Sequence, residues 1–383
     1  MLFKYIKVKT KGQIEGEKLL VPKLRFKEFN SEYKKYKIGD TLKVKSGKDQ
    51  KSIECINGTY PILGTGGQIG TTNSFLYDKP SVLIGRKGTI NKPQYMTTPF
   101  WTVDTLFYTD IKEEFNTKYI FYAFQNINWK KYDESTGVPS LSCKTIEEIL
   151  YYIPNKDEQD KISTFITLLD KKIELQNQKI EALKIYKKGL MQKLINSNNC
   201  EEKSISEFGT IITGTTPSKL IQSYWHNGTI VWVTPSDITE SKDIYNSHDM
   251  LTPDGLKAGR FVPAGSILIT CIASIGKNAI LKVDGSCNQQ INAIIPNKNF
   301  NADYLYYLFE LKKDYLQSTA GTSATSIINK TSFEKLVFKI HNIGQQNEYS
   351  KILNCLESKI ETEKHKFKKL TLLKKSLLQQ MFI

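Results

Sequence analysis

The feature that most constrains the fold of this chain is a long segment that occurs twice, 187 residues apart. Residues 159–195 read QDKISTFITLLDKKIELQNQKIEALKIYKKGLMQKLI, and they align without a gap with residues 346–382, QNEYSKILNCLESKIETEKHKFKKLTLLKKSLLQQMF. LDKKIE in the first copy falls on LESKIE in the second, and KKGLMQ falls on KKSLLQ. A repeat of this length predicts that the chain contains the same structural unit twice.

Both copies have the periodicity of a coiled-coil helix. Apolar residues recur at alternating spacings of four and three, and polar residues interrupt this seam at matching places, Gln176 and Lys187 in one copy and Glu363 and Lys374 in the other. Two ordinary amphipathic surface helices are the alternative, but chance helices would not share their interruptions. We predict two helices of about 38 residues, each near 57 Å at ~1.5 Å per residue. The predicted coiled-coil interface consists of Ile162, Leu169, Gln176, Leu183, Leu190, Tyr349, Leu356, Glu363, Leu370 and Leu377.

The segments before the two helices correspond as well, in the same order but more loosely. TKYIFYAFQNINWKKY (117–132) resembles ADYLYYLFELKKDYLQ (302–317), and short apolar runs between Gly, Pro and Thr predict strands. We therefore predict an α+β fold in which two tandem globular domains are each followed by a long helix. The predicted division is a poorly ordered leader (1–19), a first globular domain (20–153), a first long helix (154–195), a second globular domain (196–340) and a second long helix (341–383).

The charge balance suggests a polyanionic partner. The chain carries 54 Lys and Arg against 39 Asp and Glu, a net charge of +15, which favours nucleic acid binding. An AT-rich genome would also raise the lysine content, and only three of the cations are arginine. Residues 1–153 contain 24 cations and 16 anions, whereas residues 196–340 contain 13 of each. If both globular domains bind DNA, the second must use a local patch rather than its overall charge.

The sequence contains no motif for catalysis or for a cofactor. It has no G-x-x-x-x-G-K-[ST] phosphate-binding loop and no N-P-P-Y or D-P-P-Y tetrapeptide. The six cysteines form no C-x-x-C pair, and the four histidines lie outside metal-ligand spacing. We expect no catalytic residue, no metal and no cofactor, and free thiols in a reducing cytosol. No apolar run approaches the ~18 residues of a membrane span, so we expect a cytoplasmic protein.

Candidate DNA contacts come from loops that combine glycine with cationic or hydroxyl side chains. Lysine neutralises phosphates, and the hydroxyls of Ser and Thr donate to them. Arginine makes the best bidentate contact with guanine, so Arg86 and Arg260 are the predicted base-reading residues. Ordinary solvated turns are the competing interpretation. The predicted DNA-binding residues are Lys43, Lys45, Lys48, Lys51, Arg86, Lys87, Lys92, Thr215, Thr216, Ser218, Lys219, Ser236, Lys257, Arg260, Ser274 and Lys277.

The order of globular segment, long helix, globular segment and long helix resembles the specificity subunit of Type I restriction-modification systems. The resemblance is carried by QDKISTFITLLDKKIE, by the terminal LKKSLLQQMFI, and by PKLRFKEF (22–29) followed by KKYKIGD. In the second globular segment, FGTIITGTTPSK and CNQQINAIIPN (287–297) are similar to motifs that recur in the family's target-recognition domains. The first globular segment departs from this pattern and shows FWTVDTLFY (100–108) instead.

The resemblance implies a DNA-binding subunit that does no chemistry and holds no cofactor. Each globular segment would be a target-recognition domain that reads one half of a bipartite, asymmetric site in double-stranded DNA. The implied partners are two methyltransferase (modification) subunits, which use S-adenosylmethionine, and two motor-nuclease (restriction) subunits. A stand-alone DNA methyltransferase or nuclease is one alternative, and a coiled-coil adaptor that does not bind DNA is another.

The resemblance also implies that the helices act as a conserved spacer. The heptad pattern alone allows parallel or antiparallel pairing, but two recognition domains at opposite ends of one rod require antiparallel helices, with Gln176 expected to face Glu363. A rod of about 57 Å corresponds to about 17 base pairs at ~3.4 Å each, an upper bound on the distance between the two half-sites.

Overall fold

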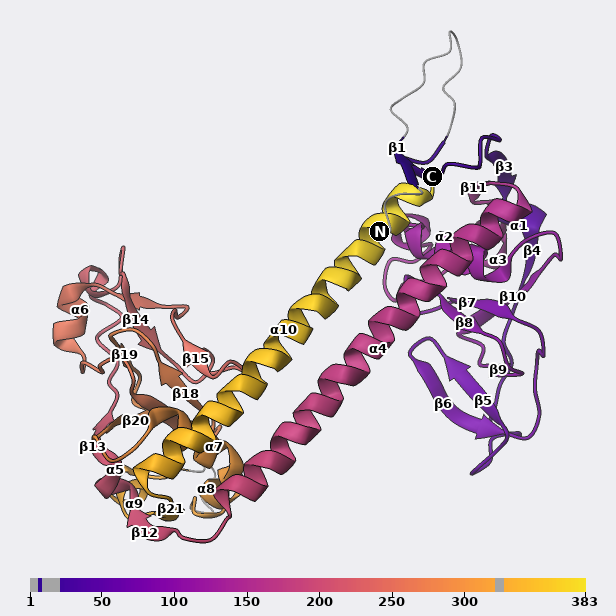
Figure 1. Cartoon of the computed structure of the whole chain (residues 1–383). Coiled ribbons are helices and arrows are strands. Elements are labelled where there is room, and N and C mark those ends of the chain that lie inside the picture. Colours follow the sequence, from indigo (N-terminus) through magenta and orange to yellow (C-terminus); the bar gives the residue numbers. More distant parts are fainter. Residues whose placement is uncertain (1–5, 9–20, 321–326) are drawn as a thin grey trace. The chain divides into compact units, whose positions relative to one another are not determined.

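The computed structural model describes residues 6–8, 21–320 and 327–383. Contacts divide the chain into two units, one formed by the residues up to Asn177 together with His365–Ile383, and the other by Gln178–Lys364. Each unit therefore combines one globular segment with parts of both long helices (Figure 1). The mixture of helices and short strands confirms the predicted α+β class.

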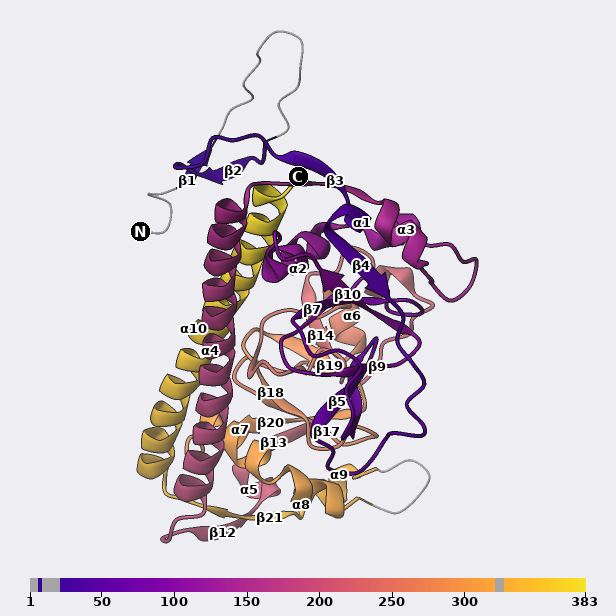
Figure 2. The same ribbon diagram turned by 90° about the vertical axis from the view of Figure 1, so that its right-hand side faces the viewer.

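The two long helices are α4 (Lys156–Ile195) and α10 (Ile343–Met381). In the first unit the start of α4 packs along the end of α10, and in the second unit the end of α4 packs along the start of α10. The helices therefore run antiparallel within each unit, and Figure 2 shows the start of α4 next to the end of α10 in the first unit. The alternating spacing of four and three defines ten seam positions in α4, and the repeat places ten more in α10, each 187 residues further along. All of them are buried or half-buried, as a coiled-coil seam requires. The α4 positions are 162, 166, 169, 173, 176, 180, 183, 187, 190 and 194.

The register of this pair differs from the expected one in the first unit. With Gln176 facing Glu363, Asp170 would face Lys369. The Asp170 carboxylate instead pairs with the ammonium of Lys374 at 2.6 Å, about one helical turn further along. This displacement of the ion pair is consistent with seam side chains that enter the space between residues of the facing helix instead of lying directly opposite one residue.

The second unit shows the same displacement. The expected register places Lys187 opposite Ile352, which is 40% exposed. Lys187 pairs instead with Glu357, and both of these side chains are only 17% exposed. Lys179 and Glu363 form a further ion pair between the helices, at 3.0 Å. The ion pairs of each unit are thus displaced from the expected alignment in the same direction.

In the described part of the first globular segment there are eleven strands, three helices and a short 3-10 turn (Trp129–Tyr132). The helices are α1 (Ile38–Thr41), α2 (Thr117–Asn126) and α3 (Cys143–Glu148). The strands are β1 (Ile6–Val8), β2 (Leu24–Phe26), β3 (Lys34–Lys37), β4 (Leu42–Lys45), β5 (Tyr60–Gly64), β6 (Gly67–Thr72), β7 (Ser81–Gly85), β8 (Gln94–Met96), β9 (Trp101–Thr102), β10 (Leu106–Ile111) and β11 (Leu150–Ile153).

Outside residues 321–326, which the structure does not describe, the second globular segment contains ten strands, five helices and a 3-10 turn (Gln222–Tyr224). The helices are α5 (Ile205–Phe208), α6 (Pro253–Ala258), α7 (Ala302–Leu311), α8 (Lys313–Ser318) and α9 (Lys330–Glu334). The strands are β12 (Glu201–Ser204), β13 (Gly209–Thr213), β14 (Ile230–Val233), β15 (Asp243–Ile244), β16 (Met250–Leu251), β17 (Ile267–Thr270), β18 (Asn278–Leu281), β19 (Gly285–Cys287), β20 (Ile291–Pro296) and β21 (Val337–Ile340).

The two globular segments share one topology. The main sheet has the order β4-β10-β7-β8 in the first and β13-β20-β17-β18-β15 in the second. A smaller sheet contains one parallel pair in each segment, β5 with β9 and β14 with β19. A two-stranded ribbon precedes each long helix, β3 with β11 and β12 with β21. The repeat seen in the sequence is therefore a repeat of strand pairing as well.

This topology gives the divergent segment FWTVDTLFY a structural counterpart. β10 pairs between β4 and β7 in the first segment, as β20 pairs between β13 and β17 in the second. The carbonyl of Thr102 accepts a hydrogen bond from the Lys48 N–H at 2.9 Å, and the carbonyl of Cys287 accepts one from the Thr215 N–H at the same distance. Residues 100–108 thus occupy the place of the CNQQINAII motif although the amino acids differ.

The opening of the chain is tied into the first unit. Strand β1 pairs antiparallel with β2, so this part of the predicted leader has regular structure, while residues 1–5 and 9–19 lie outside the described residues. The guanidinium of Arg25, on β2, donates to both carboxylate oxygens of Glu158 at 2.7 and 2.6 Å, and the Tyr33 hydroxyl donates to the same carboxylate at 3.2 Å. Arg25 and Glu158 are almost completely buried, so this pair fastens the opening segment to the first turn of α4.

Candidate nucleic-acid interface

Three loops of the first unit meet where β4 ends, β10 begins and β7 ends. The Lys48 N–H donates to the Thr102 carbonyl at 2.9 Å, and the Arg86 N–H donates to the Thr105 carbonyl at 2.8 Å. These backbone bonds hold the loops together without using side chains, which remain available for a ligand. We name this surface the first loop edge; it consists of residues 46–49, 86–89 and 102–105.

The first loop edge presents cations and two exposed carboxylates, those of Asp49 and Asp104. Lys48 and Lys87 are exposed, and Arg86 is half-buried. The Arg86 Nη1 atom donates to the backbone carbonyl of Asp104 at 3.3 Å, which holds the guanidinium beside this exposed acidic residue. Arg86, the predicted base-reading arginine, is therefore held next to Asp104, whose carboxylate can accept hydrogen bonds.

The other predicted lysines of the first unit are not equivalent to one another. The Lys45 ammonium pairs with Asp110 at 2.9 Å and lies 5.8 Å from the centre of the Tyr77 ring. The hydrogen bond from Lys45, with a second one from Tyr77, lowers the pKa of the Asp110 carboxyl. A phosphate contact by Lys45 would therefore require this ion pair to open. The remaining candidates are exposed: Lys43, Lys51 and Lys92.

The second unit repeats the arrangement where β13 ends, β20 begins and β17 ends. The Thr215 N–H donates to the Cys287 carbonyl at 2.9 Å, and the Cys271 N–H donates to the Gln290 carbonyl at 2.8 Å. Burial raises the pKa of both cysteine thiols to about 12, so these residues serve through their backbone and not as nucleophiles. We name this surface the second loop edge; it consists of residues 213–216, 271–277 and 287–290.

The second loop edge presents amide and hydroxyl groups. The Thr216 hydroxyl donates to Oε1 of the exposed Gln289 at 2.5 Å. The guanidinium of Arg260, the other predicted base-reading arginine, donates to the Thr213 carbonyl at 2.8 Å. Thr215 differs from its prediction, because its hydroxyl oxygen is buried and cannot reach a phosphate. Of the remaining candidates in these loops, Ser274 is half-buried and Lys277 is exposed.

Some of the predicted contacts in the second unit are engaged within the fold. The Lys219 ammonium pairs with Asp249 at 2.5 Å and lies 3.8 Å from the centre of the Trp225 ring. Lys257 pairs with Asp254 at 3.0 Å within the short helix α6. Ser236 is exposed and shares a hydrogen bond of 2.7 Å with the Thr234 hydroxyl, and Ser218 is exposed.

Asp104 and Gln289 also lie at these edges, and their side chains are exposed. Each lies in a segment singled out in the sequence, FWTVDTLFY and CNQQINAIIPN, but neither was predicted to contact DNA. Two signals could have identified them: an acidic residue between basic loops, and the order of the repeat, which places both segments at the same point before the last strand of the main sheet. The two segments have too few residues in common for their equivalence to be recognised from the sequence alone.

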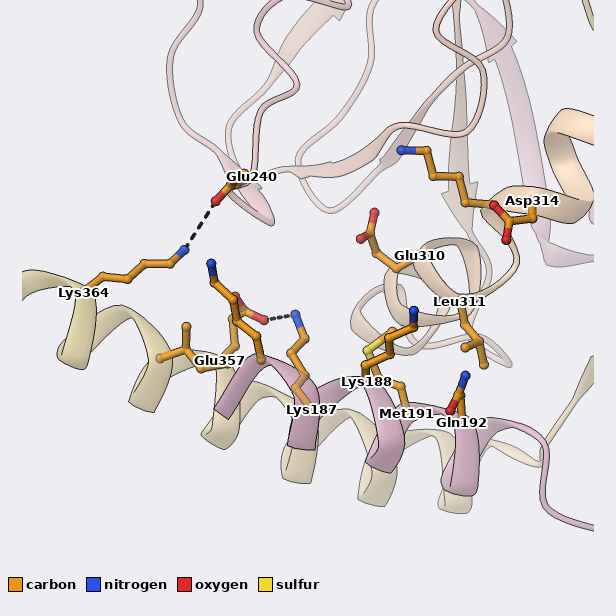
Figure 3. Close-up of a pocket in the computed structure, with 13 residues that line it drawn as sticks. Lys187, Lys188, Met191, Gln192, Glu240, Glu310, Leu311, Asp314, Glu357 and Lys364 are labelled. Carbon is orange, nitrogen blue, oxygen red and sulfur yellow. Dashed lines mark hydrogen bonds and ion pairs between the residues drawn. The ribbon is translucent and has the colours of Figure 1, made fainter. Parts of the chain in front are cut away.

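The second unit also contains a cavity of about 560 Å³ where α4 and α10 face α7 and α8. Figure 3 shows that its lining carries both signs of charge, with an ion pair between Lys187 and Glu357 and another, at 3.7 Å, between Lys364 and Glu240. Burial raises the pKa of Glu310, which points into this space. Because the opposite charges largely offset one another, this cavity does not form the cationic surface that a nucleic acid requires.

The described part of the chain lacks the features of a metal site, a disulfide or a membrane-spanning helix. Its side chains include no cluster of three or more His, Cys, Asp and Glu with the geometry to hold a metal ion. The six cysteines are free thiols. Among residues 6–8, 21–320 and 327–383, no helix is both long and apolar enough to cross a membrane.

Comparison with known proteins identifies the family of this chain by evidence that does not depend on the structure. The family model described as "Type I restriction modification DNA specificity domain" matches twice, at residues 30–184 and 197–372. The chain is 32% identical over 168 residues to the Type I restriction enzyme MjaIX specificity subunit of Methanocaldococcus jannaschii, and 29% identical over 166 residues to the EcoR124I/EcoR124II specificity subunit of Escherichia coli. These matches cover 42% and 41% of this chain and span only 39% and 41% of the two relatives.

The fold is similar to that of a solved protein. The crystal structure of the S subunit of a Type I restriction-modification system from M. genitalium matches 95% of this chain and 99% of its own, with a TM-score of 0.65 and 15% sequence identity. At this identity the likeness concerns the arrangement of the elements alone. The two matches of the family model nevertheless follow the two copies of the repeat, each of which ends in a long helix.

Proposed function

Because the chain belongs to the Type I restriction-modification DNA specificity family, we propose that it is the specificity subunit of such a complex. In this role it reads a bipartite, asymmetric DNA site and directs modification and restriction subunits to it. It contributes recognition and no catalytic group. One half of the site is read by the first loop edge and the other half by the second.

The observation that carries this proposal is the repetition of the loop edges. The same backbone hydrogen bonds join the same three loops in both units, yet the side chains at the edge differ, with exposed Lys48 and half-buried Arg86 in one and exposed Thr216 and Gln289 in the other. A repeated scaffold with different groups at its edge is what the reading of two unlike half-sites requires. Side chains of these kinds distinguish bases by the hydrogen-bond donors and acceptors that each base pair presents in the major groove.

The long helices support a role in assembly. Several large apolar side chains on them face solvent, although the seam is filled: Leu168, Leu175, Ile185, Tyr186 and Leu372 are 55–74% exposed. Exposed apolar residues of this size favour a protein partner. We assign these helix faces to the two methyltransferase subunits and, through them, to two motor-nuclease subunits. The helices would also act as a spacer that holds the half-sites within about 17 base pairs of each other.

The test is the methylation pattern of a host that carries the methyltransferase gene with or without this chain. We expect a single bipartite motif to be methylated only when the chain is present. Purified chain that methylates or cuts DNA without a partner would establish the enzyme alternative. A methyltransferase complex whose DNA binding is indifferent to this chain would establish the adaptor alternative.

A further inference from the structure

We propose that Asp104 and Gln289 are specificity-determining residues that occupy the same place in the two units, and that Asp104 selects cytosine whereas Gln289 selects adenine. This inference rests on the proposed function and adds the base preference at one position of each half-site. It differs from the arginine-based prediction, which concerned guanine alone.

The equivalence of the two residues follows from backbone geometry. Each lies in a turn that leads from a short strand into the last strand of the main sheet along the chain, which is β10 in the first unit and β20 in the second. The turn is closed by a hydrogen bond from the Leu106 N–H to the Val103 carbonyl at 3.0 Å in the first unit, and from the Ile291 N–H to the Asn288 carbonyl at 3.1 Å in the second. Asp104 and Gln289 directly follow the two accepting residues, and both side chains are exposed.

The chemistry of Asp104 points to a base and not to the DNA backbone. A carboxylate is repelled by phosphates, so an exposed acid between Lys48 and Arg86 would weaken binding unless it gained a partner on the DNA. An ionised carboxylate can only accept hydrogen bonds. In the major groove the amino group of cytosine is the donor that acidic side chains accept from, and Arg86 lies beside Asp104 to contact a guanine.

Gln289 carries a side-chain amide where Asp104 carries a carboxylate. Its amide both accepts and donates, which matches the amino group and N7 of adenine. The Thr216 hydroxyl donates to Oε1 at 2.5 Å and uses one of the two lone pairs of this oxygen. The second lone pair remains for the adenine amino group, and the amide nitrogen remains for N7. Thr216 is therefore a positioning residue that orients the amide, rather than the phosphate contact predicted from the sequence.

The experiment is a selection from a random double-stranded DNA library with the full-length chain, followed by sequencing of the bound DNA. Isosteric substitutions exchange the two chemistries: Asp104→Asn supplies an amide in the first unit, and Gln289→Glu supplies a carboxylate in the second. We expect Asp104→Asn to replace a cytosine by an adenine in one half-site only. We expect Gln289→Glu to replace an adenine by a cytosine in the other half-site only, with preferences on the order of tenfold.

Gln192→Glu is the matched control, because it makes the same change at an exposed position of helix α4. It should leave the selected motif unchanged. If both isosteric variants select the wild-type motif, the inference is overturned. Wild-type chain that enriches no motif would instead overturn the proposed function, so the two failures are distinguishable.

A second pair of variants examines Thr216. Thr216→Val removes the hydroxyl and keeps the shape, and it should reduce the preference for adenine about tenfold while binding to unrelated DNA stays the same. Thr216→Ser keeps the hydroxyl and should restore the preference. A uniform loss of affinity on all sequences with Thr216→Val would show that Thr216 contacts a phosphate, and would refute its positioning role.

Discussion

Gln159 and Gln346, 187 residues apart, make the same two hydrogen bonds in the two units. The Oε1 atom of each accepts from the backbone N–H of the asparagine that caps a domain helix, Asn116 at 2.9 Å and Asn301 at 2.8 Å. The Nε2 atom of each donates to the carbonyl that lies five residues before it, at 3.0 and 2.8 Å. Both glutamines are almost completely buried, so each clamps the start of a long helix to the helix of its own globular segment.

Replacement of either glutamine should destabilise its own unit. Gln159→Leu or Gln346→Leu leaves a backbone N–H and a backbone carbonyl without these partners in the interior, which costs about 1–3 kcal/mol of the free energy of unfolding for each unsatisfied group. Urea unfolding monitored by tryptophan fluorescence measures this loss. The control is Gln379→Leu at an exposed position of α10, where a change within about 0.5 kcal/mol is expected. Equal effects at the three positions would contradict the clamp.

Loss of Arg25 should be more costly. Arg25→Met leaves the carboxylate of Glu158, which is fully buried, without its cationic partner, and breaking such a pair costs about 3–5 kcal/mol. The double variant Arg25→Met with Glu158→Gln should recover much of this stability, because the buried charge is then removed. Thermal unfolding of the single and double variants supplies the comparison, and identical midpoints would argue against the ion pair as the cause.

The ion pair between Lys187 and Glu357 should be sensitive to charge reversal. Lys187→Glu brings two carboxylates together at a position where both side chains are only 17% exposed, and a loss of about 1–3 kcal/mol is expected. Glu357→Lys in the same chain restores an opposite pair and should regain most of the loss. A double-mutant cycle in urea gives the coupling free energy. A coupling near zero would place these residues in a different register.

Folding stability should fall on acidification because of His341. Its ring is almost completely buried, and it is 2.7 Å from the Tyr304 hydroxyl and 2.9 Å from the Ser197 hydroxyl. Burial lowers the pKa of the ring, so the unfolded chain takes up a proton more readily than the folded protein. Stability is therefore greatest above the unfolded pKa of about 6.5 and decreases as the pH falls through it.

The urea midpoint at pH 8 and at pH 5.5 measures this dependence. His341→Asn should reduce the difference between the two midpoints. His365→Asn, at an exposed position of α10, should leave that difference unchanged. The opposite pattern for the two histidines would assign the dependence to a surface charge.

Substitution of the predicted base-reading arginines should affect DNA binding differently from substitution of the predicted phosphate-binding lysines. Arg86→Ala or Arg260→Ala should cost about 1–3 kcal/mol of binding free energy and relax one half-site only. Lys48→Ala should weaken binding on every sequence and lower the salt dependence by about one unit. Gel-shift titrations at several salt concentrations, on matched and mismatched sites, distinguish the two. A uniform loss with Arg86→Ala would make it a phosphate contact.

Local patterns in the sequence were sufficient for the architecture. The spacing of Ile162, Leu169 and their counterparts predicted which faces of the long helices are buried, because helical periodicity depends only on neighbours three and four positions apart. The constant separation of 187 residues likewise predicted two related units. The absence of catalytic motifs and the basic charge of the first segment favoured a nucleic-acid-binding protein over an enzyme. Each of these inferences compares residues along one stretch of chain.

Tertiary structure alone decided the register and the composition of the loop edges. The pairing of Asp170 with Lys374, the engagement of Lys45 by Asp110 and the contact of Thr216 with Gln289 join residues that are 65 or more positions apart. No local pattern encodes which of several lysines meets a given carboxylate, because that choice depends on strand pairing and on the packing of the facing helix. The equivalence of Asp104 and Gln289 emerged for the same reason: strand pairing preserves the position of a turn even where its side chains have diverged.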